Sequence, residues 1–209
     1  MAPIPKLTER TLAEGLDALA AADRDVARAL DEAGPPPLRR REAGFEALLG
    51  AIVSQQISKA AAATVWGRLE EAAGGFAPEA VLALGEDALR AAGLSRQKTV
   101  YARGLAEAVV TGSIDLDGLP GRPDQEVVEE LVRLKGIGRW SAEIYLLFAL
   151  GRPDAFPADD LALMIGAQRL KRLDERPNRT ALTEIAEAWR PWRGPAALLL
   201  WHYYSATGR

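Results

Sequence analysis

The chain has 209 residues, of which 48% are hydrophobic, and this is enough apolar material to fold one large domain or two lobes. Cysteine is absent and the only histidine is His202, which excludes disulfides, thiol catalysis, cysteine-held zinc or iron–sulfur sites and multi-histidine metal sites. The net charge of −3 argues weakly against a nucleic-acid partner. The sequence has no apolar run of membrane-spanning length and no signal-peptide pattern, so we expect a soluble, intracellular (cytoplasmic) protein.

Helical periodicity begins close to the start of the chain. One helix is predicted behind Thr8, a potential cap, from the spacing of Leu12, Leu16, Leu19, Val26 and Leu30. Three prolines make GPPPLRRRE (34–42) a connector, and its run Arg39–Arg41 is interpreted as a solvated surface, with DNA contact as the alternative. The next amphipathic helix ends near SQQIS (54–58) and carries Phe45, Leu48, Leu49, Ile52 and Val53.

Helices are also predicted for the rest of the chain. Ser58 and Ser95 are expected to cap two of them, and after the break at GLPGRPDQE (118–126) another carries acidic residues in its first turn. Gly136 is expected at the C′ position of that helix. Further helices follow at about 138–150, after the loop GRPDAFPADD (151–160), and at the end of the chain. No period-2 strand pattern occurs, so the predicted fold class is all-α.

The stretch LKGIGRWSAEIYLLFAL (134–150) places two glycines in a minimal turn before an apolar helix. Glycine allows positive φ and a close approach by a ligand, and the first amides of the following helix point outward at the positive end of its dipole. Such a turn suits a phosphate, contacted by Gly136, Ile137, Gly138 and Ser141, with Lys135 and Arg139 beside it. Taken alone, a G-x-G between helices is more often an ordinary αα-hairpin.

Five stretches occur in a fixed order between about residues 45 and 201: FEALLGAIVSQQISKAAA, LRAAGLSRQKTVYARGLA, LKGIGRWSA, PDAFPADD and PWRGPAALLLW. Together they resemble the helix-hairpin-helix DNA glycosylase superfamily, and within it the 3-methyladenine DNA glycosylase II branch. The resemblance implies a two-lobed, all-α fold with the active-site cleft between the lobes, in the compact form without an N-terminal β-rich domain. One lobe would span about 50–150, with the helix-hairpin-helix at 124–150, and the other would combine 1–49 with 151–209.

The implied activity is base excision repair: an alkylated purine is flipped out of double-stranded DNA and its N-glycosidic bond is hydrolysed, leaving an abasic site. Asp160 matches the catalytic aspartate, which would stabilise an oxocarbenium-like transition state and orient or deprotonate water. Capping of the next helix is the alternative for Asp159 and Asp160, and Asp154 and Asp159 are the other catalytic candidates. Trp140 stands where bifunctional relatives have a lysine nucleophile, so we expect no lyase step.

Trp140 and Trp201 match two tryptophans of the base pocket, whose indole faces would attract the positive charge of an alkylated purine. That charge also makes the base a good leaving group, so no general acid is required. By composition alone Trp140 would pack in the core, on a face shared with Ile144, Leu147 and Phe148. Larger members have a tyrosine at the position of Ile144, and Tyr145 projects about 100° away, which leaves the preferred lesion open.

Gln56 matches the wedge that fills the gap left by a flipped base, and Gln55 beside it is the other candidate; a pair of polar surface residues is the alternative. The resemblance further implies no catalytic cofactor, a structural Na⁺ or K⁺ on the backbone carbonyls of Val132, Leu134 and Ile137, and a monomer acting on double-stranded DNA with alkylated bases. The rival hypotheses are a non-catalytic DNA-binding protein and a glycosylase for oxidised or mismatched bases, which would need a protonating side chain.

Overall fold

The computed structural model describes residues 4–208, and every regular element within that range is helical, which confirms the all-α prediction. No helix in this part of the chain is long and apolar enough to cross a membrane. By its internal contacts the chain divides into two units, one of residues 1–40 and 146–209 and the other of residues 41–145. The sequence placed the corresponding boundaries near 50 and 150.

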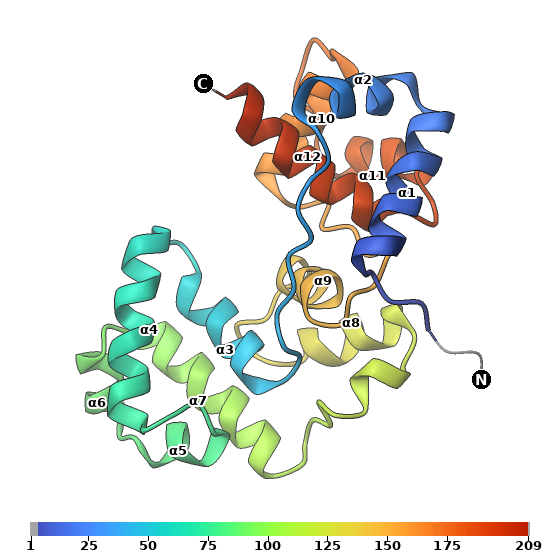
Figure 1. Cartoon of the computed structure of the whole chain (residues 1–209). Helices are drawn as coiled ribbons and strands as arrows, with labels where there is room; N and C mark the ends of the chain where they lie inside the picture. Colours follow the sequence, from blue (N-terminus) through green and yellow to red (C-terminus); the bar gives the residue numbers. More distant parts are fainter. Residues whose placement is uncertain (1–3, 209) are drawn as a thin grey trace. The chain divides into compact units, whose positions relative to one another are not determined.

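The first unit is built around α12 (Arg193–Thr207). Residues 194–200 of α12 are all buried, as expected for a helix that other elements cover on every side. Helices α1 (Glu9–Ala22), α2 (Arg24–Ala33) and α10 (Leu161–Lys171) pack against α12, and α11 (Arg179–Glu187) packs against α10 (Figure 1).

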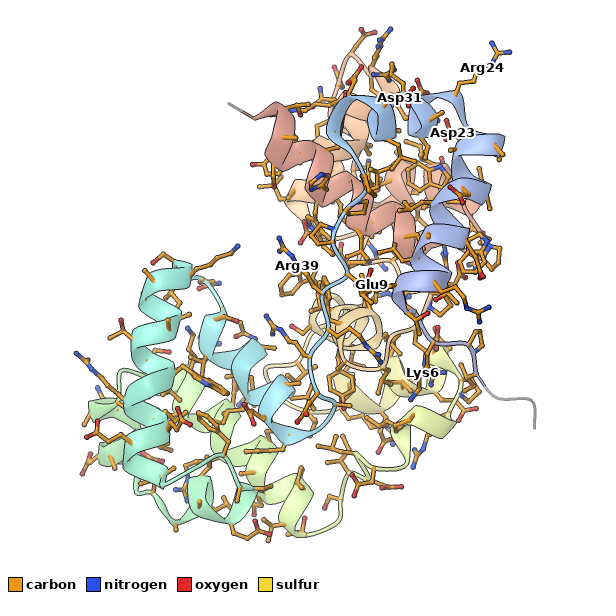
Figure 2. The ribbon with its side chains drawn as sticks, in the orientation of Figure 1. Lys6, Glu9, Asp23, Arg24, Asp31 and Arg39 are labelled. Atoms are coloured by element: carbon orange, nitrogen blue, oxygen red, sulfur yellow. The ribbon has the colours of Figure 1, made fainter. Side chains whose placement is uncertain are left out.

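A break at Asp23 divides the segment for which the sequence predicted one helix. Thr8 caps α1 as predicted, and Asp23 caps α2 by accepting a hydrogen bond from the amide of Asp25 at 3.0 Å. The Asp23 carboxylate, which lies at the α1–α2 junction (Figure 2), also accepts bonds from Lys171 Nζ at 2.6 Å and Trp189 Nε1 at 2.9 Å. The single-helix prediction was wrong because the apolar spacing continues across the break, whereas these distant partners of Asp23 leave no local pattern.

The second unit is built around α7 (Arg96–Val110). Helices α3 (Phe45–Ser54), α5 (Pro78–Ala83) and α6 (Glu86–Ala91) pack on α7, and α4 (Lys59–Ala73) packs against α3 and α5 (Figure 1). Ser58 and Ser95 cap α4 and α7 as predicted, through bonds of 3.2 and 3.3 Å from the amides of Ala61 and Lys98. The sequence did not predict α5 and α6, since six residues are too few to show a helical period.

The remaining elements of the second unit lead into the two-glycine turn. A 3₁₀ turn (Leu119–Gly121) precedes α8 (Asp124–Val132), whose first turn is acidic as predicted. The prediction that Gly136 would be the C′ residue of α8 was wrong, because the helix already ends at Val132 with Arg133 as its C-cap. Two tight turns follow, with bonds from the Leu134 amide to Leu131 O at 3.1 Å and from the Ile137 amide to Leu134 O at 3.0 Å. Helix α9 (Arg139–Phe148) then begins, and the boundary between the two units falls inside it.

Candidate active site

Asp160 lies directly before α10, in the first unit, and its carboxylate is held by three N–H donors. Its Oδ1 accepts bonds from the amides of Ala162 at 2.9 Å and Leu163 at 3.1 Å, which makes Asp160 the N-cap of the helix. The same oxygen accepts a bond from Trp201 Nε1 at 3.0 Å. The candidate catalytic residue is therefore itself the cap, and its carboxylate is fixed in position before any substrate arrives.

A glycine explains why Asp160 and Trp201 meet although 41 residues separate them. A Cβ at Gly166 of α10 would lie 2.7 Å from the carbonyl oxygen of Leu200 on α12, so only glycine permits this close packing. Trp201 follows Leu200 on α12, and Asp160 begins α10. The close helix crossing thus brings the indole N–H within reach of the carboxylate.

An aromatic contact extends this cluster. Trp201 is half-buried and stacks on Phe148, with ring centroids 5.6 Å apart and an interplanar angle of 29°. The sequence assigned Trp201 to a base pocket but gave Phe148 no part in one. The available signal was the spacing of Trp140, Ile144 and Phe148, which repeats every four residues along α9.

The two alternative aspartates are engaged in ion pairs. Asp154 accepts two hydrogen bonds of 2.9 Å from Arg193 and another from Arg190, which assigns Arg193 a structural role. Asp159 Oδ2 lies 3.4 Å from Arg179 Nε. Guanidinium groups therefore offset the charges of both Asp154 and Asp159.

In the second unit, the two glycines of the turn serve different purposes. Gly136 has a φ of +95°, and a Cβ there would overlap the ring of Tyr101 on α7. Gly138 is exposed, and a Cβ there would meet nothing within 4 Å. Ile137, at 3% exposure, anchors the turn between them. Packing therefore requires the first glycine, while the second keeps the surface open at the first amides of α9.

The polar side chains near this turn differ in how available they are. Ser141 is 5% exposed, which leaves its hydroxyl little access to a ligand. Arg139 Nε donates to Glu143 Oε1 at 2.9 Å, so this guanidinium is tied to its own helix. Lys135 is exposed. Any anion bound at the turn would therefore depend chiefly on backbone amides.

Trp140, in the first turn of α9, is 38% exposed, so the alternative that it is a core residue was wrong. Tyr145 is buried instead, and its hydroxyl accepts a bond from the Gly44 amide at 2.9 Å. Burial raises the pKa of Tyr145 above its ordinary value. Tyr145 is thus part of the core and does not replace the tyrosine that larger members have at the position of half-buried Ile144.

The turn after α3 distinguishes the two glutamines. Gln55 is half-buried, and its Nε2 donates to the carbonyl of Gly136 at 2.8 Å. Gln56 is exposed and has a φ of +55°, in the left-handed region that few residues other than glycine adopt. Of the two candidates for the wedge, Gln56 is therefore the one whose side chain lies at the surface.

The segments around the turn border an open hollow of about 390 Å³ within the second unit. Val132, Leu134 and Ile137 are among the residues that line it, together with Lys98 and Tyr101 of α7. Val132 ends α8, and the last carbonyls of a helix have no partner inside it. Carbonyl oxygens are ligands that Na⁺ and K⁺ accept, so the chemistry of this donor set fits the predicted cation.

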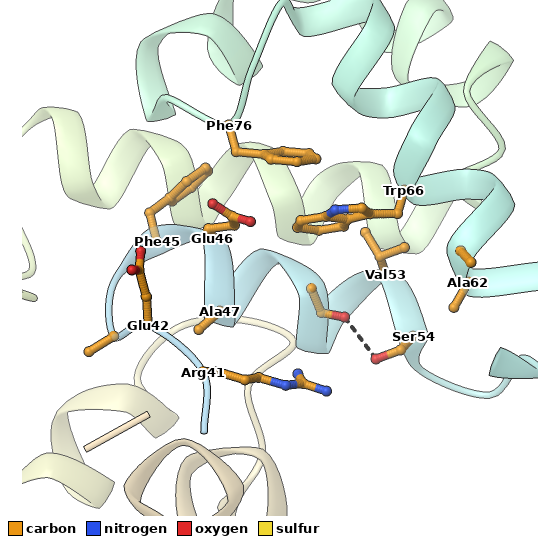
Figure 3. A pocket seen from close by; sticks show the side chains of 13 residues that line it. Arg41, Glu42, Phe45, Glu46, Ala47, Val53, Ser54, Ala62, Trp66 and Phe76 are labelled. Carbon is orange, nitrogen blue, oxygen red and sulfur yellow. Dashed lines mark hydrogen bonds between the residues drawn. The ribbon is translucent and has the colours of Figure 1, made fainter. Parts of the chain in front are cut away.

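A larger hollow of about 730 Å³ lies between α3 and α4, also within the second unit. Phe45, Trp66 and Phe76 turn toward it with Glu46 beside them (Figure 3), and the rings of Trp66 and Phe76 stack with centroids 3.9 Å apart. Of the residues singled out in the sequence for function, the basic run contributes Arg41 to its lining. No local sequence pattern indicates this hollow, because its aromatic residues come from separate segments.

Comparisons with known proteins point to the same family as the five motifs. The family model described as "HhH-GPD superfamily base excision DNA repair protein" matches residues 49–191. DNA-3-methyladenine glycosylase 1 of Schizosaccharomyces pombe is 35% identical over 161 residues, which are 75% of this chain and 71% of that protein. A solved structure of S. pombe 3-methyladenine DNA glycosylase in complex with abasic DNA has a TM-score of 0.82 at 31% identity, covering 90% of this chain and 95% of that one. The Bacillus halodurans DNA-3-methyladenine glycosidase has a TM-score of 0.81 at 34% identity, with 90% and 87% covered.

Proposed function

The chain belongs to the HhH-GPD superfamily of base excision DNA repair proteins, on its 3-methyladenine DNA glycosylase branch, and we propose that it excises alkylated purines from double-stranded DNA. The enzyme hydrolyses the N-glycosidic bond and releases the free base and an abasic site. The observation that carries this proposal is the Asp160 carboxylate, fixed by the first amides of α10 and by the indole N–H of Trp201.

Alkylation at purine N3 or N7 gives the base a positive charge, so the C1′–N bond breaks with its electron pair moving to the base and no proton is needed. The sugar then carries the positive charge. Asp160 stabilises that charge and orients a water molecule, whose oxygen bonds to C1′ and whose proton leaves through the carboxylate. Because three donors already hold Oδ1, little reorganisation is required in the transition state.

Trp140 and Trp201 are the proposed base-binding residues. Their indole faces attract a cationic purine more strongly than a neutral one, which favours alkylated bases. Trp201 is positioned for this role by its bond to Asp160 and its stacking on Phe148.

The backbone amides of Gly136 and Gly138 are proposed to bind a DNA phosphate, whereas the Ile137 amide already donates to Leu134 O at 3.0 Å. An acidic chain can bind a phosphate in this way because amides at the start of a helix supply a positive potential. The carbonyls of Val132, Leu134 and Ile137 would hold a Na⁺ or K⁺ that adds to this potential. Gln56 would occupy the gap that the flipped base leaves in the helix. The protein would act as a monomer.

Hydrolysis alone is proposed, without strand cleavage, since Trp140 lacks the amine that a Schiff base requires. The test incubates the wild type with duplex DNA carrying 3-methyladenine or 7-methylguanine and analyses free base and strand breaks before and after alkali. We expect base release, with breaks only after alkali. Breaks before alkali would contradict the monofunctional mechanism.

The same assay separates the rivals. DNA binding without release of any base would make the chain a non-catalytic DNA-binding protein. Release of 8-oxoguanine, but not of methylated purines, from matched duplexes would indicate a glycosylase for oxidised bases.

A further inference from the structure

The backbone after α3 adopts a conformation that its sequence does not favour. Gln55 leaves the helix with φ −56° and ψ 130°, and Gln56 follows at φ +55°. A side chain in the left-handed region costs free energy that glycine would avoid, so such a residue persists only where its surroundings impose the conformation. The turn that presents Gln56 must therefore be held by contacts from outside it.

Two hydrogen bonds to distant parts of the chain stabilise this turn. Gln55 Nε2 donates to the carbonyl of Gly136 at 2.8 Å, across 81 residues of sequence. Lys98 Nζ donates to the carbonyl of Val53 at 2.8 Å, across 45 residues, and occupies an acceptor in the last turn of α3. Burial lowers the pKa of Lys98, as expected for an ammonium group drawn into the protein.

Helix α7 is the common support of both contacts. Lys98 holds the end of α3, while Tyr101, three residues later on the same helix face, covers Gly136 where a Cβ would overlap its ring. The Tyr101 hydroxyl accepts a bond from Gln97 Nε2, which fixes the ring. The bond from Gln55 to Gly136 links the end of α3 to the turn before α9, so that α3, α7 and this turn are joined in pairs. All three lie within the second unit.

We propose that Gln55 is a positioning residue for base flipping: its bond to Gly136 fixes the Gln56 turn relative to the hairpin that binds phosphate. Binding of a phosphate at the hairpin then places Gln56 at a defined depth in the DNA helix. Gln55 acts through Gln56 and need not touch the reacting base. This inference rests on the proposed function and assigns different roles to two adjacent glutamines.

The experiment replaces Gln55 by methionine, which keeps the length of the side chain but removes the donor. The matched control is Gln125→Met on α8, which removes an exposed bond from Gln125 Nε2 to Glu129 at 2.8 Å. Each change is made in the full chain with Asp160→Asn, so that the DNA stays uncut. Binding to a duplex with 2-aminopurine beside the lesion reports base unstacking through its fluorescence. Gln56→Ala serves as the reference for a lost wedge.

The measured quantity is the equilibrium ratio of unstacked to stacked base in the bound duplex. We expect Gln55→Met to lower this ratio about tenfold, because one hydrogen bond is lost. Gln56→Ala should match it and Gln125→Met should behave as the parent. With Asp160 restored, Gln55→Met should lower single-turnover excision more from duplex than from single-stranded DNA, since only the duplex requires the gap to be filled.

The proposal would be overturned if Gln55→Met unstacked the base as well as the parent, which is the Asp160→Asn protein without a second change. It would also be overturned if Gln55→Met lowered excision from duplex and from single-stranded DNA by the same factor. If the parent unstacked the lesion but the wild type released no base, the proposed excision activity would be refuted and the role of Gln55 would stand. If the wild type excised the base normally but unstacking did not depend on Gln55, the role of Gln55 would be refuted and the excision activity would stand.

Discussion

Trp140 is 38% exposed although Tyr145, Leu146 and Leu147 of the same helix are buried. This indole lies in the first turn of α9, directly after the two-glycine turn that we propose binds a phosphate, and we propose that it contacts a base that leaves the DNA stack. It also stands where a nucleophilic lysine would be needed for strand cleavage. The same position therefore bears on two of our proposals, that the enzyme selects alkylated bases and that it carries out no lyase step.

Replacement of Trp140 by leucine tests the role of the indole in selectivity. Attraction between a cation and an indole is worth up to about 2 kcal/mol, so excision of 3-methyladenine should fall up to about 30-fold. Excision of neutral hypoxanthine should fall less, and the free energy of unfolding should change by less than about 1 kcal/mol because the site is exposed. The measurement is single-turnover excision of the two bases from otherwise identical duplexes. Equal losses for both would rule out a role for the charge.

At the scale of elements, the hairpin offers a matched pair of glycines. Gly136→Ala should lower the free energy of unfolding by at least about 1–2 kcal/mol, because φ is +95° and the Tyr101 ring occupies the space of a Cβ. Gly138→Ala should leave stability within about 1 kcal/mol of the wild type but weaken DNA binding, since its methyl group would project into open surface beside the amides. Thermal denaturation and duplex affinity measure the two effects. A stable Gly136→Ala protein, or unchanged affinity in Gly138→Ala, would contradict these roles.

Helices were predictable where the signal was local. Thr8, Ser58 and Ser95 cap their helices as predicted, because a capping side chain and the apolar period that follows it lie within a few residues. The break at Asp23 and the early end of α8 were missed, since distant contacts and non-helical turns decide them. The candidate site residues likewise divide into those with a local sequence signal and those without one. Motifs indicated Asp160 and Gln56, but no local pattern predicts bonds such as Gln55 to Gly136 or Trp201 to Asp160.

At the scale of the whole molecule, Asp23 connects α2 with Lys171 at the end of α10 and with Trp189 after α11. Burial alone would raise the pKa of Asp23, but the hydrogen bonds from Lys171 and Trp189 outweigh it and hold the pKa below its ordinary 3.8. A carboxylate with a depressed folded-state pKa contributes stability that is present above the unfolded-state value and is lost as the pH falls through the folded-state value.

Asp23→Asn should therefore lower the free energy of unfolding by about 1–3 kcal/mol at pH 7, while asparagine still caps α2. The difference from the wild type should narrow as the pH falls below about 3.8, where the Asp23 contribution is lost. Thermal denaturation of both proteins across this range provides the test. A difference that stayed constant down to the acid limit would show that the charge of Asp23 does not matter.

We propose that Asp160, although it caps α10, is the catalytic carboxylate. Asparagine caps a helix as well as aspartate does, and its amide oxygen can still accept the bond from the Trp201 indole, so Asp160→Asn keeps the cap and removes the charge. Single-turnover excision of 3-methyladenine from duplex DNA by this variant is the most direct measurement. We expect a folded protein whose excision rate falls by a factor of about 10²–10⁴ relative to the wild type. Wild-type excision by Asp160→Asn would contradict it and return the catalytic role to Asp154 or Asp159.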